Sequence, residues 1–321
     1  MSRDWDIPDQ ISVPIKPDED GFIGRECPQE ECEGYFKIEC GTGLEGEGLP
    51  CHCPYCGHTA GHDHFWTKEQ IEYAKSVAMR EIDAAMRREL KQLECNYPAR
   101  GMFGIGISMK LEPGAPVPLR HYREKRLETE VVCDQCTLRY TIYGVFAYCP
   151  DCGAHNSRQI LSKNLDLAVK ELDLAQQVDA NDLAEHLIAD SLENVVSAFD
   201  GFGREVVRVH APKSNDPARA ANLSFQNLAG VKANLQALFG FDLPGGITSD
   251  EWKLAVRCFS KRHLLAHKMG VIDQKYIDAT NDPAAIVGRR IVITADEVRG
   301  LIDAVRKLGE TLARRLSGEV N

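Results

Sequence analysis

Eight of the twelve cysteines in this chain stand in pairs, and one set of four has the spacing of a metal site. A spacer of two residues lets both sulfurs of a pair point into one turn, and two such turns facing each other supply a tetrahedron of thiolates. The second pair reads Cys-Pro-x-Cys-Gly, in which Pro150 restricts the entering chain and Gly153 permits a left-handed turn. We therefore predict a structural zinc site at Cys133, Cys136, Cys149 and Cys152.

A second set of cysteines lies nearer the N-terminus, and its ligands are less uniquely specified. Its second pair again reads Cys-Pro-x-Cys-Gly, whereas four residues separate the first pair. The predicted ligands are Cys27, Cys32, Cys53 and Cys56. Nearby side chains that could substitute for one of them are Cys40, Cys51, His52, His58, His62 and His64. The last three histidines could instead bind a second metal or simply lie on the surface.

Both sites are expected to stabilise the fold rather than to catalyse. Four cysteines close the coordination shell, whereas a catalytic zinc keeps one position open. We therefore expect two structural Zn²⁺ ions, each contributing to the free energy of folding. The acidic N-terminus has no apolar core of the kind found in secretory signals, so a reducing cytoplasm and metal binding are favoured over disulfides.

A third group of reactive side chains lies in the run DEWKLAVRCFSKRHLLAHKMGVID, residues 250–273. Arg262, His263 and His267 stand near the predicted end of a helix that Gly270 can terminate. Histidine can move a proton near neutral pH, and the planar guanidinium of arginine can hold phosphate oxygens. Two other interpretations stay open. Arg262 and His267 could be cations facing the helix dipole, and His263 with His267 could form half of a metal site that lacks an obvious third ligand.

This run resembles the motif of the HEPN superfamily, whose members are all-helical ribonucleases and nucleotide-binding domains. The family motif is an arginine, a polar residue and then a histidine, matched here by Arg262, His263 and His267. The later segment VGRRIVITADEVRGLIDAVRKLGETL also looks like the C-terminal part of one HEPN group, and the resemblance covers roughly residues 157–321. It implies cleavage of RNA without a metal, giving 2',3'-cyclic phosphate ends, with Arg262, His263 and His267 at the catalytic site of a homodimer. Some HEPN domains keep the fold without cutting.

Two functions follow as hypotheses. The first is an endoribonuclease of HEPN type, a defence or toxin-like effector that acts on RNA, with the zinc ribbons for targeting and with a protein activator or antitoxin as a further partner. The alternative is a non-catalytic zinc-ribbon module that binds nucleic acid or protein and dimerises through its helices. The net charge of −10 counts against bulk attraction to nucleic acid, although it leaves room for a local basic surface.

The expected architecture is mostly α, with two small β-type zinc ribbons before a helical bundle. The expected segments are a flexible arm at 1–19, a first ribbon at 20–66, a connecting helix at 67–95, a linker at 96–127, a second ribbon at 128–156 and a HEPN-like helical domain at 157–321. Helical periodicity places helices near 158–177, 181–207, 218–239, 249–269, 273–280 and 295–317. No stretch reaches the roughly 18 apolar residues of a membrane span, so no membrane contact is expected.

Overall fold

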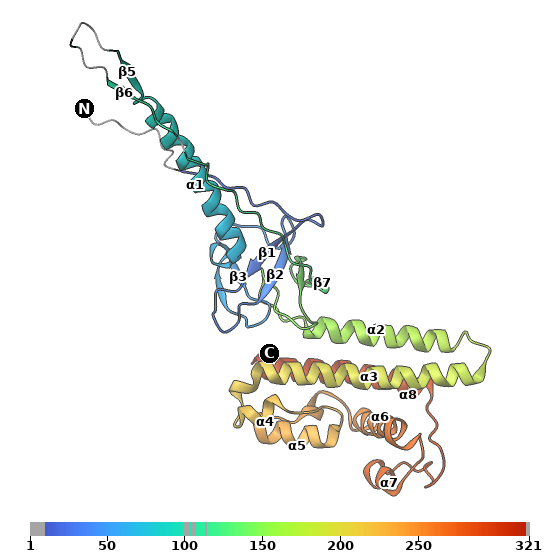
Figure 1. Ribbon diagram of the computed structural model, residues 1–321. Helices are drawn as coiled ribbons and strands as arrows, with labels where there is room; N and C mark the ends of the chain where they lie inside the picture. The colour runs from blue at the N-terminus through green and yellow to red at the C-terminus, as the bar shows by residue number, and fades with distance from the viewer. Residues whose placement is uncertain (1–9, 99–102, 104–106, 113, 319–321) are drawn as a thin grey trace. The chain divides into compact units, whose positions relative to one another are not determined.

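The computed structural model describes residues 10–98, 103, 107–112 and 114–318. The chain divides into two compact units, Met1–Ala154 and His155–Asn321. Helices dominate the described chain, and its named strands all lie in the first unit (Figure 1). The predicted mostly-α class, with small antiparallel sheets preceding a helical region, is therefore confirmed.

The first unit is built on one antiparallel sheet that takes two strands from each expected ribbon. Its strands, in spatial order, are β1 (Phe22–Glu26), β2 (Tyr35–Glu39), β8 (Arg139–Ile142) and β7 (Thr129–Val132). The two halves join where Ile38 of β2 pairs with Tyr140 of β8. The sequence left open whether the ribbons pack together, and this shared sheet shows that they form a single module.

A short hairpin and a buried cluster complete this module. β3 (Pro50–His52) pairs with β4 (Thr59–Gly61), and the turn η1 (His62–Phe65) follows. The core combines tetrad cysteines with apolar side chains from both halves, namely Phe36, Phe65, Val131, Leu138, Tyr140 and Ile142. Phe36 and Phe65 meet edge to face, with ring centroids 5.9 Å apart. The hydrophobic core of the module is small, so metal binding has a large share of its stability to supply.

A long helix, α1 (Lys68–Lys91), follows the first ribbon close to the predicted bounds. Thr67 and Gln70 form a capping box at its start. Beyond it, β5 (Cys95–Tyr97) pairs with β6 (Ile107–Met109). The expected linker then returns beside the helix, because Arg120 donates its backbone N–H to the Ser76 hydroxyl, 3.0 Å away.

The expected flexible arm divides at the edge of the described chain. Residues 1–9 lie outside the described residues, as do the linker residues 99–102, 104–106 and 113. In the described part of the arm, Asp18 accepts a hydrogen bond from Lys37 at 2.6 Å. Lys16 donates its N–H to the hydroxyl of Tyr122 at 3.2 Å. The arm is thus tied to the first unit over its last residues, contrary to the expectation of a free segment.

The second unit is an all-helical bundle. Its helices are α2 (Ser157–Ala175), α3 (Asn181–His210), α4 (Pro217–Ala221), α5 (Leu228–Phe239), α6 (Ser249–Lys268), α7 (Gln274–Thr280) and α8 (Ala295–Ser317), with short turns η2 (Ala211–Lys213) and η3 (Leu243–Gly246). The bounds agree with the sequence prediction except at one place. The helix expected over 218–239 is interrupted at residues 222–227, where Asn227 caps a new helix by accepting from the N–H of Gly230.

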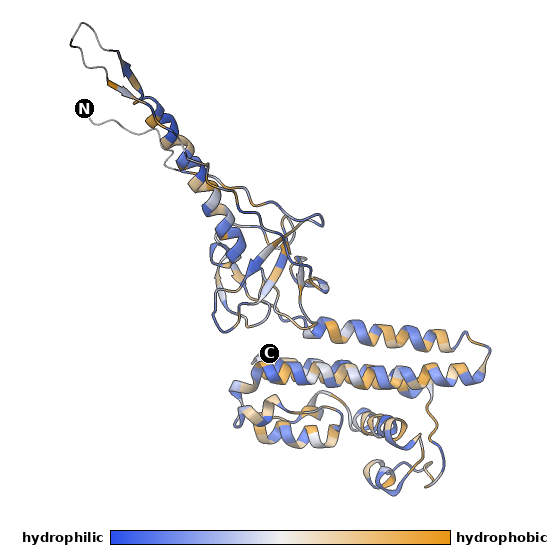
Figure 2. Cartoon of the chain, in the orientation of Figure 1, coloured by the Kyte–Doolittle hydropathy of each residue, from blue (hydrophilic) through white to orange (hydrophobic). Residues whose placement is uncertain are grey.

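The bundle is held by α8, which packs against α2, α3 and α6. Its buried side chains recur at helical spacing and include Val298, Leu301, Val305, Leu308 and Leu312. Figure 2 shows apolar and polar residues alternating along α2 and α3 in the same way. An amphipathic stripe on each long helix therefore builds the core. Phe199, Phe225 and Phe259 join that core as an edge-to-face aromatic cluster.

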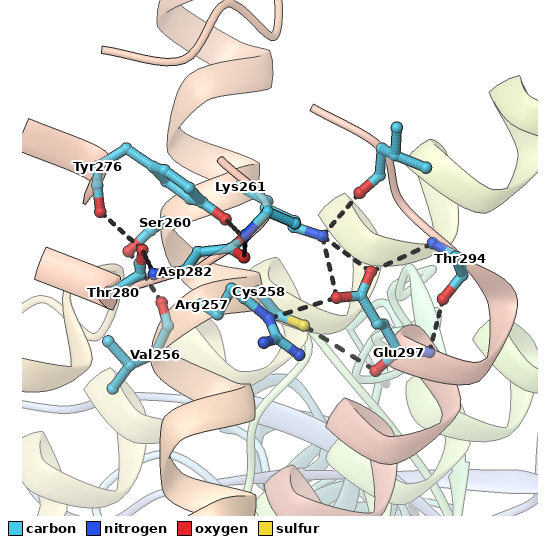
Figure 3. A network of polar contacts seen from close by, with 12 residues as sticks. Val256, Arg257, Cys258, Ser260, Lys261, Tyr276, Thr280, Asp282, Thr294 and Glu297 are labelled. Carbon is cyan, nitrogen blue, oxygen red and sulfur yellow. Dashed lines mark hydrogen bonds and ion pairs between the residues drawn. The ribbon is translucent and has the colours of Figure 1, made fainter. Parts of the chain in front are cut away.

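A buried ion pair connects α6 to the start of α8 (Figure 3). Lys261 is only 6% exposed, and its Nζ lies 2.8 Å from Glu297 Oε2 and 2.6 Å from the carbonyl oxygen of Val292. Glu297 also forms the capping box of α8 with Thr294. Because Lys261 directly precedes Arg262, this contact sets the rotation of α6 that presents Arg262 and the two histidines.

Replacing Lys261 by Met is expected to loosen the contact between α6 and α8, since it removes the nearer of two cations from the partly buried Glu297 carboxylate and leaves Arg257, whose Nε lies 3.3 Å away. Removing one partner of a fully buried pair typically costs about 3–5 kcal/mol, and the remaining Arg257 makes the expected loss smaller. Hydrogen exchange of the full chain, followed by mass spectrometry, would show faster exchange in α6 and α8. The matched control is Lys253→Met on the same helix, whose ion-pair partner Asp250 is 93% exposed. Equal exchange in the two variants would contradict the role given to Lys261.

Candidate metal centres and candidate active site

The first predicted tetrad is assembled in the first unit. Cys27, Cys32, Cys53 and Cys56 each bring a sulfur within 4.8 Å of the other three. The Sγ atoms of Cys27 and Cys56 are 3.7 Å apart, as are those of Cys32 and Cys53. Four sulfurs at about 2.3 Å from one ion in a tetrahedron lie about 3.8 Å from each other. The spacing therefore fits a metal ion bound by four thiolates.

The second tetrad has the same geometry. Cys133, Cys136, Cys149 and Cys152 also lie within 4.8 Å of one another. Cys133 and Cys152 are 3.6 Å apart at sulfur, and Cys136 and Cys149 are 3.4 Å apart. These are the eight predicted ligands, and each predicted set converges on one point. Among the described residues no other group of three or more potential ligands comes together.

The nearby donors that could have substituted are placed elsewhere. Cys51 is buried but outside the tetrad, and Cys40 is exposed. His58 lies 3.2 Å from the amide nitrogen of Gln29, and His52 lies 2.8 Å from the hydroxyl of Thr59. His64 is 64% exposed beside Asp63. The six alternatives thus serve as core, surface or hydrogen-bonding residues, and the four-cysteine set of the first site stands.

The second cysteine pair of each tetrad lies in a tight turn that a backbone hydrogen bond closes. Gly57 donates its N–H to the carbonyl of Cys53 at 2.9 Å, and Gly153 donates to Cys149 at 3.0 Å. Both glycines have left-handed backbones, with φ of 72° and 68°. The glycine of the Cys-Pro-x-Cys-Gly pattern is therefore required at these two places, because a side chain would be strained there.

The two Cys-Pro-x-Cys-Gly turns also hold each other by a reciprocal pair of backbone hydrogen bonds. His52, just before Cys53, donates its N–H to the carbonyl of Pro150 at 2.7 Å. Tyr148, just before Cys149, donates its N–H to the carbonyl of Pro54 at 2.9 Å. The cysteine turn of each tetrad is therefore hydrogen-bonded to the cysteine turn of the other. We expect that disruption of one tetrad also weakens the other.

Burial raises the pKa of some tetrad thiols, whereas at Cys56 and Cys133 hydrogen bonds outweigh burial and lower the pKa. Burial raises the pKa of Cys27 to about 11, and it raises the pKa of Cys136 to about 11 as well. Protonated thiols are poor ligands, so a bound cation must displace these protons. Metal binding by this unit therefore strengthens as the pH rises.

The candidate active site lies in the second unit, at the C-terminal end of α6. His263 and His267 are exposed one turn apart, with ring centroids separated by 4.7 Å. Arg262, the residue before His263, is half-buried on the same helix end. The helix ends as predicted at Met269 and Gly270, both left-handed, and the Gly270 N–H donates to the carbonyl of Leu264. The three predicted residues thus lie together on an accessible helix end.

Two residues that the sequence analysis did not single out hold Arg262 in place. Its Nη1 lies 3.4 Å from Oε1 of Gln226, whose own amide nitrogen lies 3.2 Å from Asp200 Oδ2. Asp200 is 7% exposed and accepts the N–H of Phe225 at 2.6 Å. A buried acid on α3 therefore orients Gln226, which orients Arg262. The one available signal was the polar run around residues 222–227 inside an otherwise helical pattern.

Arg262 keeps unused donor capacity at this site. Its Nε is buried and has no hydrogen-bond partner within the described part of the chain. A buried unpaired donor is costly, and this one can meet an anion only if the Arg262 side chain moves. Histidines beside such an arginine provide proton carriers next to an anion-binding group.

Comparisons with known proteins supply no further assignment, since no family model, curated protein or solved structure matches the chain. None of the helices in the described ranges combines the length and apolar character needed to cross a bilayer.

Replacing Cys149 by Ser is expected to reduce the bound metal by more than one ion per chain. The variant removes one ligand of the second tetrad, and the reciprocal hydrogen bonds then also loosen the first. Elemental analysis of the purified full chain measures this directly, with two ions expected for the unaltered protein. The control is Cys258→Ser, because Cys258 is buried in the core of the second unit and belongs to neither tetrad. Loss of only one ion would show that the two centres are independent.

Proposed function

We propose that this protein is an endoribonuclease of HEPN type that cleaves RNA without a catalytic metal. The observation that carries the proposal is the grouping of Arg262, His263 and His267 on the exposed end of α6, with Arg262 oriented through Gln226. The all-helical second unit and the helix-end position of the motif agree with the sequence resemblance. This assignment rests on residue chemistry and geometry.

In the proposed reaction the 2'-oxygen of a ribose attacks the adjacent phosphorus while the bond from phosphorus to the 5'-oxygen breaks. One histidine accepts the proton of the 2'-hydroxyl, and a proton is delivered to the departing 5'-oxygen. Arg262 stabilises the negative charge that gathers on the phosphate oxygens. The products are a 2',3'-cyclic phosphate and a 5'-hydroxyl. We assign proton transfer to His267, and orientation or RNA binding to His263.

A homodimer is proposed to complete the site. The segment after α6 exposes apolar side chains, with Met269 82%, Val271 39% and Val292 73% exposed. The two segments that carry them lie side by side, because the N–H of Ile291 donates to the carbonyl of Gly270, and we take their exposed side chains as one apolar patch. Met269 lies two residues beyond His267. Two copies that cover this patch would bring the two Arg262–His267 sets toward each other.

The two tetrads are proposed to hold Zn²⁺. Eight cysteines in two closed sets suit zinc in a structural role, and when bound the ions supply folding free energy to the small first unit. Cys27, Cys32, Cys53 and Cys56 would hold one ion, and Cys133, Cys136, Cys149 and Cys152 the other. That unit is then the part of the chain that recruits an RNA or an activating protein.

His267→Ala and Arg262→Ala are each expected to lower RNA cleavage by about 10²-fold or more, since each removes a proton carrier or a charge-stabilising group. Arg262→Lys is expected to fail as well, because an ammonium cannot replace the planar guanidinium. The assay uses mixed RNA without added Mg²⁺ and detects cyclic-phosphate ends. Lys253→Ala on the same helix is the control. Undiminished cleavage by His267→Ala would overturn the proposal, and binding of RNA without any cleavage would favour the non-catalytic alternative.

Met269→Glu is expected to convert the dimer into a monomer and to reduce cleavage in parallel, because a charge in the apolar patch must be desolvated on association. Light scattering coupled to gel filtration measures the mass of the full chain. Leu183→Glu, which alters another exposed apolar residue of the second unit, should leave the mass unchanged. A monomeric unaltered protein with full cleavage activity would refute the composite site.

A further inference from the structure

A separate cavity opens beside the candidate active site, between α5, α6 and α7. Its volume is about 340 Å³. Gln226, which orients Arg262, lies on its wall, and so does His263. The cavity is therefore continuous with the group of residues to which cleavage is assigned. This volume is close to the lower limit, about 300 Å³, of pockets that hold small organic ligands.

The floor of this cavity is apolar and largely rigid. It is formed by side chains that are almost fully buried, with Leu228 1%, Phe259 3%, Leu264 1% and Tyr276 3% exposed. Phe259 is fixed by its edge-to-face contact with Phe199, and Tyr276 by its hydrogen bond to Asp282 at 2.8 Å (Figure 3). Such a floor accepts the flat face of a ring rather than a charged or hydrated group.

The rim carries polar side chains, of which Asn227 and Ser260 are neutral, whereas Asp273 and Lys275 are charged. Asn227 accepts the Gly230 N–H through Oδ1, which leaves its NH₂ group to donate. The Ser260 hydroxyl donates to the carbonyl of Val256 at 2.8 Å, which leaves its oxygen lone pairs to accept. Asp273 lines the same cavity and accepts the N–H of Tyr276, so its second oxygen can accept. Donors and acceptors are therefore both present at the edge of an apolar slot.

We propose that this cavity binds a nucleobase of the RNA substrate, next to the phosphate that Arg262 holds. A base has two flat apolar faces and an edge of alternating donors and acceptors, which match the floor and the rim respectively. The sugar and phosphate of the same nucleotide then extend past His263 toward Arg262 and His267. This inference rests on the proposed function. It assigns the selectivity of the ribonuclease for its RNA substrate to the cavity between α5, α6 and α7.

The first experiment measures binding without cleavage. AMP, CMP, GMP, UMP and ribose 5-phosphate are titrated by calorimetry into full-length His267→Ala, whose altered residue does not line the cavity. At least one nucleotide is expected to bind about tenfold or more tightly than ribose 5-phosphate, the size of effect that base stacking on a protein surface gives. Equal binding of ribose 5-phosphate and all four nucleotides would overturn the proposal.

Matched variants test whether the base occupies this cavity. Ala229→Trp and Ala279→Trp fill it from opposite walls at exposed positions, and each should abolish the preference for nucleotide over ribose 5-phosphate. Ala233→Trp is the control, because Ala233 is exposed on the same helix as Ala229 but lies outside the cavity. A preference that survives both filling variants would place the base elsewhere and reject the proposal.

A cleavage readout separates this proposal from the proposed function. If the protein cuts RNA, sequencing of the cut ends should show a base preference that Ala229→Trp weakens and Ala233→Trp preserves. Cleavage with an unchanged preference in Ala229→Trp would reject the base pocket while leaving the ribonuclease intact. Base-dependent binding that Ala229→Trp removes, in a protein that never cuts RNA, would support the pocket and reject the ribonuclease.

Discussion

A charge buried in protein must meet a partner, and this constraint organises the second unit around Asp200. Its carboxylate is 7% exposed on α3 and receives the N–H of Phe225, the amide of Gln226 and the guanidinium of Arg204. The backbone of Phe225 and the side chain of Gln226 reach Asp200 because the chain is not helical between α4 and α5. This non-helical segment places Phe225 in the aromatic core and Gln226 against Arg262. The candidate active site and the cavity beside it both depend on this one buried acid.

The same constraint acts on α6 from its other side. Lys261 is buried, and the carboxylate of Glu297 and the carbonyl of Val292 compensate its charge. The neighbouring Arg262 is held through Gln226. Consecutive residues are thus anchored to different parts of the bundle, Lys261 to the start of α8 and Arg262 to α3. A helix end that is restrained on two sides can present His263 and His267 in a fixed arrangement.

In the first unit the corresponding problem is that five of the eight tetrad cysteines are buried with a modest apolar core. Burial alone favours the neutral thiols, whereas a cation shared by four sulfurs favours the thiolates. The shared sheet and the reciprocal hydrogen bonds between His52 and Pro150 and between Tyr148 and Pro54 make the two tetrads parts of one structure. The unit is therefore better described as one module with two metal centres than as two ribbons joined by a linker.

The sequence by itself determined the parts of this protein that depend on local spacing. The Cys-x2-Cys turns and the left-handed glycines involve residues within a few positions of each other, so pattern alone predicted them. Amphipathic periodicity likewise placed the long helices and brought Arg262, His263 and His267 to the end of α6. The one helix predicted with wrong bounds, over 218–239, is broken at residues 222–227. There Phe225 and Gln226 donate hydrogen bonds to Asp200, which is more than twenty residues away in the sequence.

Only the tertiary structure decided what depends on partners distant in the chain. It joined Ile38 to Tyr140 and so merged the two ribbons, and it removed Cys40, Cys51 and the nearby histidines from the ligand set. It also paired Lys261 with Glu297 and formed the cavity between α5, α6 and α7. These contacts follow from which buried groups must be satisfied once helices and strands pack together, and that requirement has no signature in the local sequence.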